Sequence, residues 1–194
     1  MINKILVIAF FSLLVVGCSS FSDRESQPVN NINNLENLYF WDISGKIGLR
    51  VNGETNSFYF SWINNKKTRE EKIIFHHPFK GVFLKIIKKD GITKVKLDGK
   101  EYSEKNIINR IEKNIEIGIG FDDLKNIVMG KGNNKITITE YEKNKPKYGN
   151  FVNKDGKLSK IVWNFKKNSV FPEEIKIKLN KDFIKIKIDK TVLK

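Results

Sequence analysis

Apolar and polar residues alternate along most of this chain, and this alternation restricts the fold more than any other feature. From Trp41 to Val51, every second residue is apolar or glycine, and most of those between are polar. Near the C-terminus, isoleucines alternate with lysines in residues 174–179 and 183–189. Successive side chains of a strand point to opposite faces. The pattern therefore predicts an antiparallel sheet that is covered on one side only.

Further strands are expected where β-branched and aromatic residues lie between turn signals. The turn signals are Asn52-Gly53, Asp90-Gly91, Asp98-Gly99 and Asp155-Gly156. Including those above, about ten strands are expected. They cover residues 41–51, 58–63, 72–76, 81–88, 93–97, 135–141, 148–152, 158–166, 174–179 and 183–189.

Two helical segments interrupt these strands. Ser103 is expected to cap the first helix, whose apolar face holds Ile107, Ile108, Ile111 and Ile115. Asp122 or Asp123 is expected to begin the second helix, which Gly130 ends and which carries Leu124, Ile127 and Val128. Two such helices could cover the concave side of a curved sheet. The pattern leaves open whether they enclose a solid core or an apolar cavity.

The N-terminus has the pattern of an export signal. Lys4 precedes an apolar run over residues 5–16, which is shorter than the roughly 20 residues that span a bilayer. The run ends in Gly17-Cys18, and a small residue before a cysteine is typical of lipoprotein processing. Cys18 is the only cysteine of the chain, so it has no intramolecular disulfide partner. We therefore expect residues 1–17 to be a lipoprotein signal peptide and Cys18 to carry the lipid.

The remaining chain divides into a tether and one domain. Residues 18–34 are polar and predict a lipidated flexible tether, and residues 35–194 are long enough for one domain with a core. The formal net charge is +14. Export argues against a nucleic-acid partner. The charge fits a solvated lysine-rich surface, anionic lipid headgroups or an acidic protein partner.

Catalytic and metal-binding patterns are weak. His76 and His77 are adjacent on an expected strand, so their side chains point to opposite faces and make a poor metal pair. The acidic pairs, such as Glu70-Glu71, lack a neighbouring histidine, and no Gly-x-Ser-x-Gly elbow exists. We expect no enzyme activity, no metal and no cofactor.

Several segments, in this order, resemble the LolB family of outer-membrane lipoprotein receptors, over residues 34–194. The first is the glycine-containing strand 41–49, followed by the aromatic strand 57–62 that ends in tryptophan. The third is strand 73–77 with the loop Pro78-Phe79-Lys80-Gly81, and the fourth is the helical segment 124–130. Ile127 stands where the family commonly has tryptophan, and prolines common around this helix are missing. These departures concern the local shape of the expected helical lid more than the function.

The resemblance implies an α+β fold, in which a strongly curved antiparallel sheet forms a half-open β-barrel with a small helical lid over an apolar cavity. It implies a monomeric receptor that accepts lipoproteins from a soluble LolA-like periplasmic carrier and inserts them into the inner leaflet of the outer membrane. The receptor would be lipid-anchored and face the periplasm; Ser19, after the cysteine, favours the outer membrane. The alternatives are a structural or assembly lipoprotein and a carrier of another hydrophobic ligand.

Two groups of residues would carry this function. In the family, an exposed apolar residue at the loop tip inserts cargo into the membrane, which assigns membrane contact to Pro78, Phe79, Lys80 and Gly81. From the pattern alone, Phe79 could equally fold back onto the core. Acyl-chain contact or ordinary core packing is expected for the residues of the most aromatic dry face and of the helices: Trp41, Ile47, Leu49, Phe58, Phe60, Trp62, Ile107, Ile108, Ile111, Leu124 and Val128.

Overall fold

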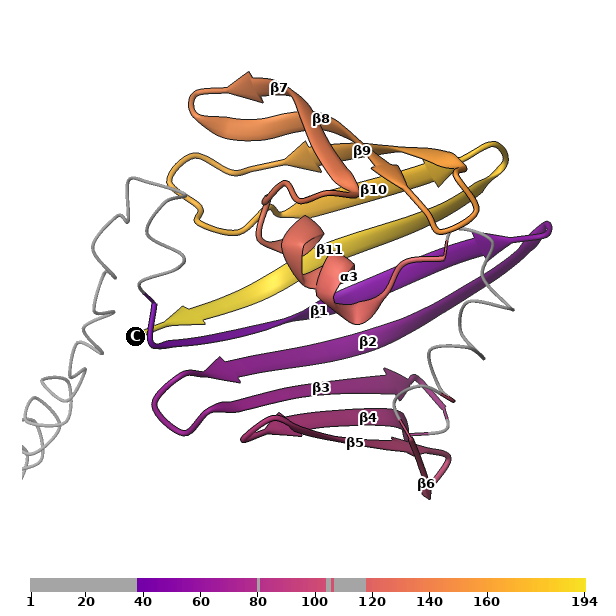
Figure 1. The fold of residues 1–194 in the computed structure, drawn as a ribbon, viewed down its shortest axis with the longest axis vertical. Coiled ribbons are helices and arrows are strands. Elements are labelled where there is room, and N and C mark those ends of the chain that lie inside the picture. The colour runs from indigo at the N-terminus through magenta and orange to yellow at the C-terminus, as the bar shows by residue number, and fades with distance from the viewer. Residues whose placement is uncertain (1–37, 80, 104–105, 107–117) are drawn as a thin grey trace, which may run out of the picture.

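The computed structural model describes residues 38–79, 81–103, 106 and 118–194. In these ranges the chain forms an 11-stranded antiparallel sheet and the helix α3 (Phe121–Val128), which lies against one face of the sheet (Figure 1). The strands are β1 (Phe40–Val51), β2 (Glu54–Asn65), β3 (Glu70–His77), β4 (Gly81–Lys89), β5 (Ile92–Leu97), β6 (Lys100–Tyr102), β7 (Ile136–Glu142), β8 (Lys145–Val152), β9 (Leu158–Asn164), β10 (Glu174–Leu179) and β11 (Asp182–Leu193).

The strand order is β6-β5-β4-β3-β2-β1-β11-β10-β9-β8-β7. The edge strands β6 and β7 do not pair with each other in the described residues, so the sheet is not closed. The first and last strands meet at the centre of the sheet, where β1 pairs with both β2 and β11. The predicted antiparallel, half-open sheet is therefore confirmed. The short strand β6 was not expected from the sequence.

Because neighbouring strands alternate in direction, their connections gather at two ends of the sheet. One end carries the β1–β2 turn, the β3–β4 loop, the β8–β9 turn and the β10–β11 turn, and lies on the right in Figure 1. We call it the loop end. The β2–β3, β4–β5 and β7–β8 turns lie at the opposite end.

The expected start of the second helix was wrong. The helix begins at Phe121, and Gly120 is the N-cap, without a side-chain hydrogen bond. Asp122 and Asp123 lie in the first turn, and each pairs with a lysine from another part of the chain. The predicted end is confirmed, because Gly130 has φ +66° and its amide donates to the carbonyl oxygen of Ile127 at 3.0 Å.

The first expected helix falls mostly outside the described residues. The hydroxyl of Ser103 accepts a hydrogen bond from the backbone amide of Asn106 at 3.3 Å. This contact, three residues along the chain, is typical of a helix N-cap. Residues Ile107, Ile108 and Ile111 lie outside the described ranges.

The core lies on the inner face of the sheet, between the sheet and α3. Trp41 at the start of β1 is 1% exposed and packs against Trp62 and Phe171, with ring centroids 5.8 and 5.5 Å apart. Phe171 belongs to the β9–β10 connection. Lys145 donates a 2.6 Å hydrogen bond to the carbonyl oxygen of Ser169 in this connection, and burial lowers the pKa of this lysine. The core is thus filled at the end where the chain enters β1.

Candidate functional site

Helix α3 bridges the two halves of the open sheet. On one side, Lys125 pairs with Glu71 of β3 at 3.0 Å. On the other side, the indole Nε1 of Trp163 in β9 donates to the carbonyl oxygen of Ile127 at 2.7 Å. Since β3 and β9 lie in opposite halves of the sheet, these contacts hold the helix across the inner face of the sheet.

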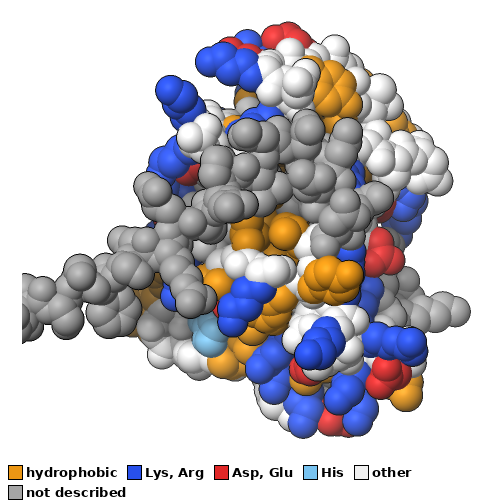
Figure 2. Space-filling model, turned by 90° about the vertical axis from the view of Figure 1, so that its left-hand side faces the viewer, with side chains coloured by type: hydrophobic (Ala, Val, Ile, Leu, Met, Phe, Trp, Pro, Cys, Tyr) orange, Lys and Arg blue, Asp and Glu red, His pale blue; other side chains and the backbone are white. Residues whose placement is uncertain are grey.

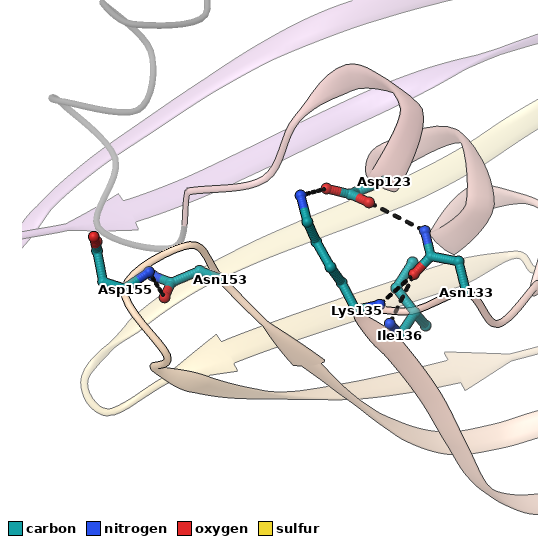
Figure 3. Close-up of polar contacts among 6 residues, drawn as sticks. All are labelled: Asp123, Asn133, Lys135, Ile136, Asn153 and Asp155. Atoms are coloured by element: carbon teal, nitrogen blue, oxygen red, sulfur yellow. Dashed lines mark hydrogen bonds and ion pairs between the residues drawn. The ribbon is translucent and has the colours of Figure 1, made fainter.

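A buried carboxylate fixes the segment that follows α3. Asp123 accepts hydrogen bonds from Lys135 Nζ at 3.0 Å and from Asn133 Nδ2 at 3.1 Å (Figure 3). The Asn133 side chain in turn accepts from the amides of Lys135 and Ile136, both at 2.8 Å. The helix is therefore linked to the start of β7 through side chains as well as through the chain itself.

The inner-face residues predicted from the sequence fall into two groups. Four sheet residues, Trp41, Ile47, Phe60 and Trp62, are buried among the chain's own side chains, as is Val128 of α3. Leu49, Phe58 and Leu124 are only partly buried and pack at the margin of this core. The side chains of the second group are partly exposed to solvent.

Phe58 belongs to an aromatic cluster near the loop end. Its ring meets Phe75 of β3 and Phe83 of β4 edge-on, with centroids 5.7 and 5.4 Å apart. Phe83 is partly buried, as is the neighbouring Leu97 of β5. This cluster offers half-accessible apolar surface on the inner side of β2–β5.

Sequence reasoning missed Phe75 and Phe83 as members of the candidate site. Strict alternation along β4 puts Leu84 and Ile86 on the inner face and Phe83 on the outer face. A register shift in the β3–β4 pairing, between Phe75 and His76, breaks this alternation. No local signal in the sequence marks such a shift.

Phe79 lies in the β3–β4 loop at the loop end and is 92% exposed. Its amide donates to Nδ1 of His77 at 3.3 Å, and the two rings are 6.0 Å apart. Pro78 and Gly81 are exposed too, and Gly81 has φ +72°, a conformation that favours glycine. The loop therefore presents a phenyl ring to the surroundings. Lys80, between them, lies outside the described residues, as does Cys18.

Other features of the described residues do not point to catalysis. A polar pocket of about 280 Å³ lies at the end opposite the loop end and is lined by charged residues that include Arg69, Glu71 and Lys88. Within the described ranges, no group of three or more potential metal ligands comes together. None of the described helices has the length and apolarity to cross a membrane.

The surface carries many lysine and arginine side chains. Figure 2 shows hydrophobic side chains gathered in the middle of one face, and Lys and Arg crowded below them, at the level where β3–β6 lie in Figure 1. Apolar and basic surface thus occur close together.

Comparisons with known proteins agree with this geometry. The family profile described as "Outer membrane lipoprotein LolB" matches residues 40–190, which is most of the chain. The comparison with curated proteins finds no sequence match.

Several solved structures have a similar fold. A LolA superfamily protein from Nitrosomonas europaea superposes with a TM-score of 0.53 at 9% identity, over 80% of this chain and 86% of that one. A domain described as an outer membrane lipoprotein-sorting protein, from Vibrio parahaemolyticus, superposes with a TM-score of 0.50 at 9% identity. The match covers 87% of this chain and 94% of that one. A DUF1329 family protein from Desulfovibrio piger superposes with a TM-score of 0.52 at 8% identity, over 84% of this chain and 88% of that one. At these identities the likeness concerns the fold alone.

Proposed function

The chain belongs to the LolB family of outer-membrane lipoproteins, and from this premise we propose that it is a lipoprotein receptor. It accepts a lipoprotein from a LolA-like periplasmic carrier, shields the acyl chains on its inner face, and releases them into the inner leaflet of the outer membrane. Acyl chains on Cys18 hold it there, facing the periplasm, with residues 1–17 removed and 18–34 as the tether. Family membership supports the role in lipoprotein localisation.

The physical task is to keep hydrocarbon out of water. A lipoprotein with three acyl chains exposes roughly 40 CH₂ groups, and burying each of them stabilises by about 0.8 kcal/mol. Such cargo cannot cross water unshielded. It needs apolar protein surface that holds the chains less tightly than the bilayer does. No covalent step is needed, which fits a family of lipoprotein-binding proteins.

The observation that carries the proposal is the position of Phe79 relative to the inner aromatic cluster. Phe79 lies in the loop between β3 and β4, and those two strands bring Phe75 and Phe83 to the inner face. The exposed Phe79 and the inner rings of Phe75 and Phe83 thus belong to the same β3–β4 hairpin. Acyl chains that leave the interior along this hairpin would meet apolar surface up to the point of membrane contact.

In this proposal Phe79 enters the lipid surface, and Pro78, Lys80 and Gly81 complete the membrane-contacting loop. The phenyl ring of Phe79 is 92% exposed and lies outside the hydrophobic core, with His77 as its recorded ring contact. Leu49, Phe58 and Leu124 are the acyl-chain contacts that need least rearrangement, because they are already partly exposed. The buried set of Trp41, Ile47, Phe60, Trp62 and Val128 forms the floor beneath them, and Ile107, Ile108 and Ile111 complete the lid.

The test is a transfer assay with a carrier-bound lipoprotein and outer-membrane vesicles. Phe79→Glu should leave the melting temperature unchanged and still take cargo from the carrier, but fail to deposit it in the vesicles. Ile92→Glu is the matched control, because Ile92 is also apolar and exposed, at 63%, but lies at the opposite end of the sheet. Normal deposition by Phe79→Glu would refute the proposed role of the loop.

A further inference from the structure

The outer surface of the β8–β9 hairpin has exposed aliphatic residues that the proposed function does not use. Val152 ends β8 and Leu158 begins β9, and they are direct cross-strand partners. They are 40% and 54% exposed. One exposed aliphatic residue is common on a protein surface, but a paired and exposed Val–Leu at the tip of a hairpin is unusual.

We infer that the tip of the β8–β9 hairpin is a second membrane contact, which enters the lipid headgroup region together with the Phe79 loop. The inference rests on the proposed receptor function. It adds a contact from the other half of the open sheet, so that the loop end would meet the lipid surface at two separate places rather than one.

The topology brings the two contacts to the same end of the molecule. β3 and β8 both run toward the loop end, and β4 and β9 both run back from it, because the strands alternate in direction along the sheet. The Phe79 loop lies in one half of the sheet and the β8–β9 turn in the other (Figure 1). Two contacts set apart in this way would fix the orientation of the domain on a membrane.

The β8–β9 turn is rigid enough to present the pair in a defined position. The side chain of Asn153 is buried, and its Oδ1 accepts hydrogen bonds from the amides of Asp155 and Lys157, both at 2.9 Å. Figure 3 shows the Asn153–Asp155 contact. The amide of Val152 also donates to the carbonyl oxygen of Lys135 at 2.9 Å. This turn would therefore lose little conformational entropy when it contacts lipid.

The charges around the pair suit anionic lipid headgroups. Lys160, on the outer face of β9, is the cross-strand partner of Lys178 in β10, and both are exposed. Lys181 is exposed in the β10–β11 turn at the same end. Each lysine close to an anionic membrane contributes about 1 kcal/mol of attraction.

The composition favours lipid over a protein partner. Protein interfaces are enriched in aromatic residues and arginine and depleted in lysine at their centres. Here the tip pair is one valine and one leucine, the exposed pair Tyr148 and Val162 lies further along the same outer face, and the cations nearby are lysines. Apolar side chains flanked by lysines are typical of elements that lie in the headgroup region.

Tryptophan reporters test the inference. The three native tryptophans are at most 3% exposed, so their emission should not respond to lipid. In a chain that starts at Ser19, and thus keeps every described strand, Leu158→Trp should shift to the blue on binding vesicles of phosphatidylethanolamine and phosphatidylglycerol, and brominated lipid should quench it. Ile92→Trp, at the opposite end, should show neither effect.

A loss-of-contact variant makes the test quantitative. Val152→Ser with Leu158→Ser should weaken vesicle binding roughly tenfold, the value expected for removing two half-buried aliphatic groups from the headgroup region. Ile92→Ser should change it less than twofold. Both variants should keep the melting temperature of the parent chain, because all three side chains are exposed.

The outcomes separate this inference from the proposed function. If Phe79→Trp responds to vesicles and Leu158→Trp does not, the second contact is refuted and the receptor function stands. If Leu158→Trp responds only when an acidic carrier protein is added, the hairpin is a protein-docking site and the inference is wrong. If neither Phe79→Trp nor Leu158→Trp responds to vesicles, both proposals fail.

Discussion

The indole nitrogen of Trp163 donates a 2.7 Å hydrogen bond to the main-chain carbonyl oxygen of Ile127, in the last turn of α3. Both residues are buried, at 3% and 0% exposure. The same oxygen also accepts the backbone amide of Gly130 at 3.0 Å, so it has two donors at the end of the helix. The bond from Trp163 satisfies the buried indole N–H and fastens the helix to the half of the sheet that contains β9.

Trp163→Phe should destabilise the protein by about 1–2 kcal/mol more than Trp41→Phe. The two substitutions remove the same atoms from buried sites, but Trp41 Nε1 has no acceptor among the described residues. Chemical denaturation of the two variants measures the difference. Equal losses would mean that the bond to Ile127 contributes nothing.

Asp123→Asn should cost about 1–2 kcal/mol of stability, whereas Asp122→Asn should cost less than about 0.5 kcal/mol. The Asp123 side chain is 10% exposed and bonds both Lys135 and Asn133, while the Asp122 side chain is 85% exposed in its pair with Lys88. Thermal unfolding of both variants provides the comparison. A larger loss for Asp122→Asn would contradict the buried position of the Asp123 contact.

Gly45→Ala should disrupt the centre of the sheet, with a cost of roughly 3 kcal/mol or more. An added Cβ would lie 1.9 Å from the carbonyl oxygen of Lys187, so β1 would have to separate from β11. Gly48→Ala, on the same strand, meets no atom within 4 Å and should change stability by less than about 1 kcal/mol. The fraction of soluble, folded protein and its melting temperature check this, and similar behaviour of both variants would count against the close approach.

Phe83→Glu should reduce the binding of a fluorescent fatty acid at least tenfold, because it places a carboxylate among the aromatic rings of Phe58 and Phe75. Val82→Glu, at the adjacent and 51% exposed position, should bind the probe almost as well as the parent chain. A fluorescence titration measures both affinities. Unchanged binding by Phe83→Glu would remove this cluster from the candidate site.

Much of the fold was predictable from local patterns. The alternation of isoleucine with lysine in β10 and β11 correctly predicted one buried and one exposed face, because side-chain direction in a strand depends only on position. Gly130 was correctly predicted to end the helix, because its left-handed conformation is a local property. The resemblance to the LolB family is confirmed by the family match.

Other features depended on residues far away in the sequence. Asp123 does not cap α3 but is the third residue of the helix, where its carboxylate binds Lys135 and Asn133 from the segment that follows. Phe83 contacts Phe58 and Phe75 because the register of β3 against β4 shifts, which is a property of the pair of strands. Phe171 packs on Trp41 although 130 residues separate them in the sequence, so no window of sequence could predict that this part of the inner face is filled.

The sequence by itself determined where most of the strands lie and which of their side chains alternate between core and water, since hydrophobic patterning and turn chemistry act over a few residues. Only the tertiary structure decided which inner-face residues are packed and which stay accessible. That outcome depends on how α3, the β9–β10 connection and the shifted β3–β4 pairing fill the space over the sheet. Segments that are distant in the sequence together fill this space, so the room left for a ligand is decided only when the chain has folded.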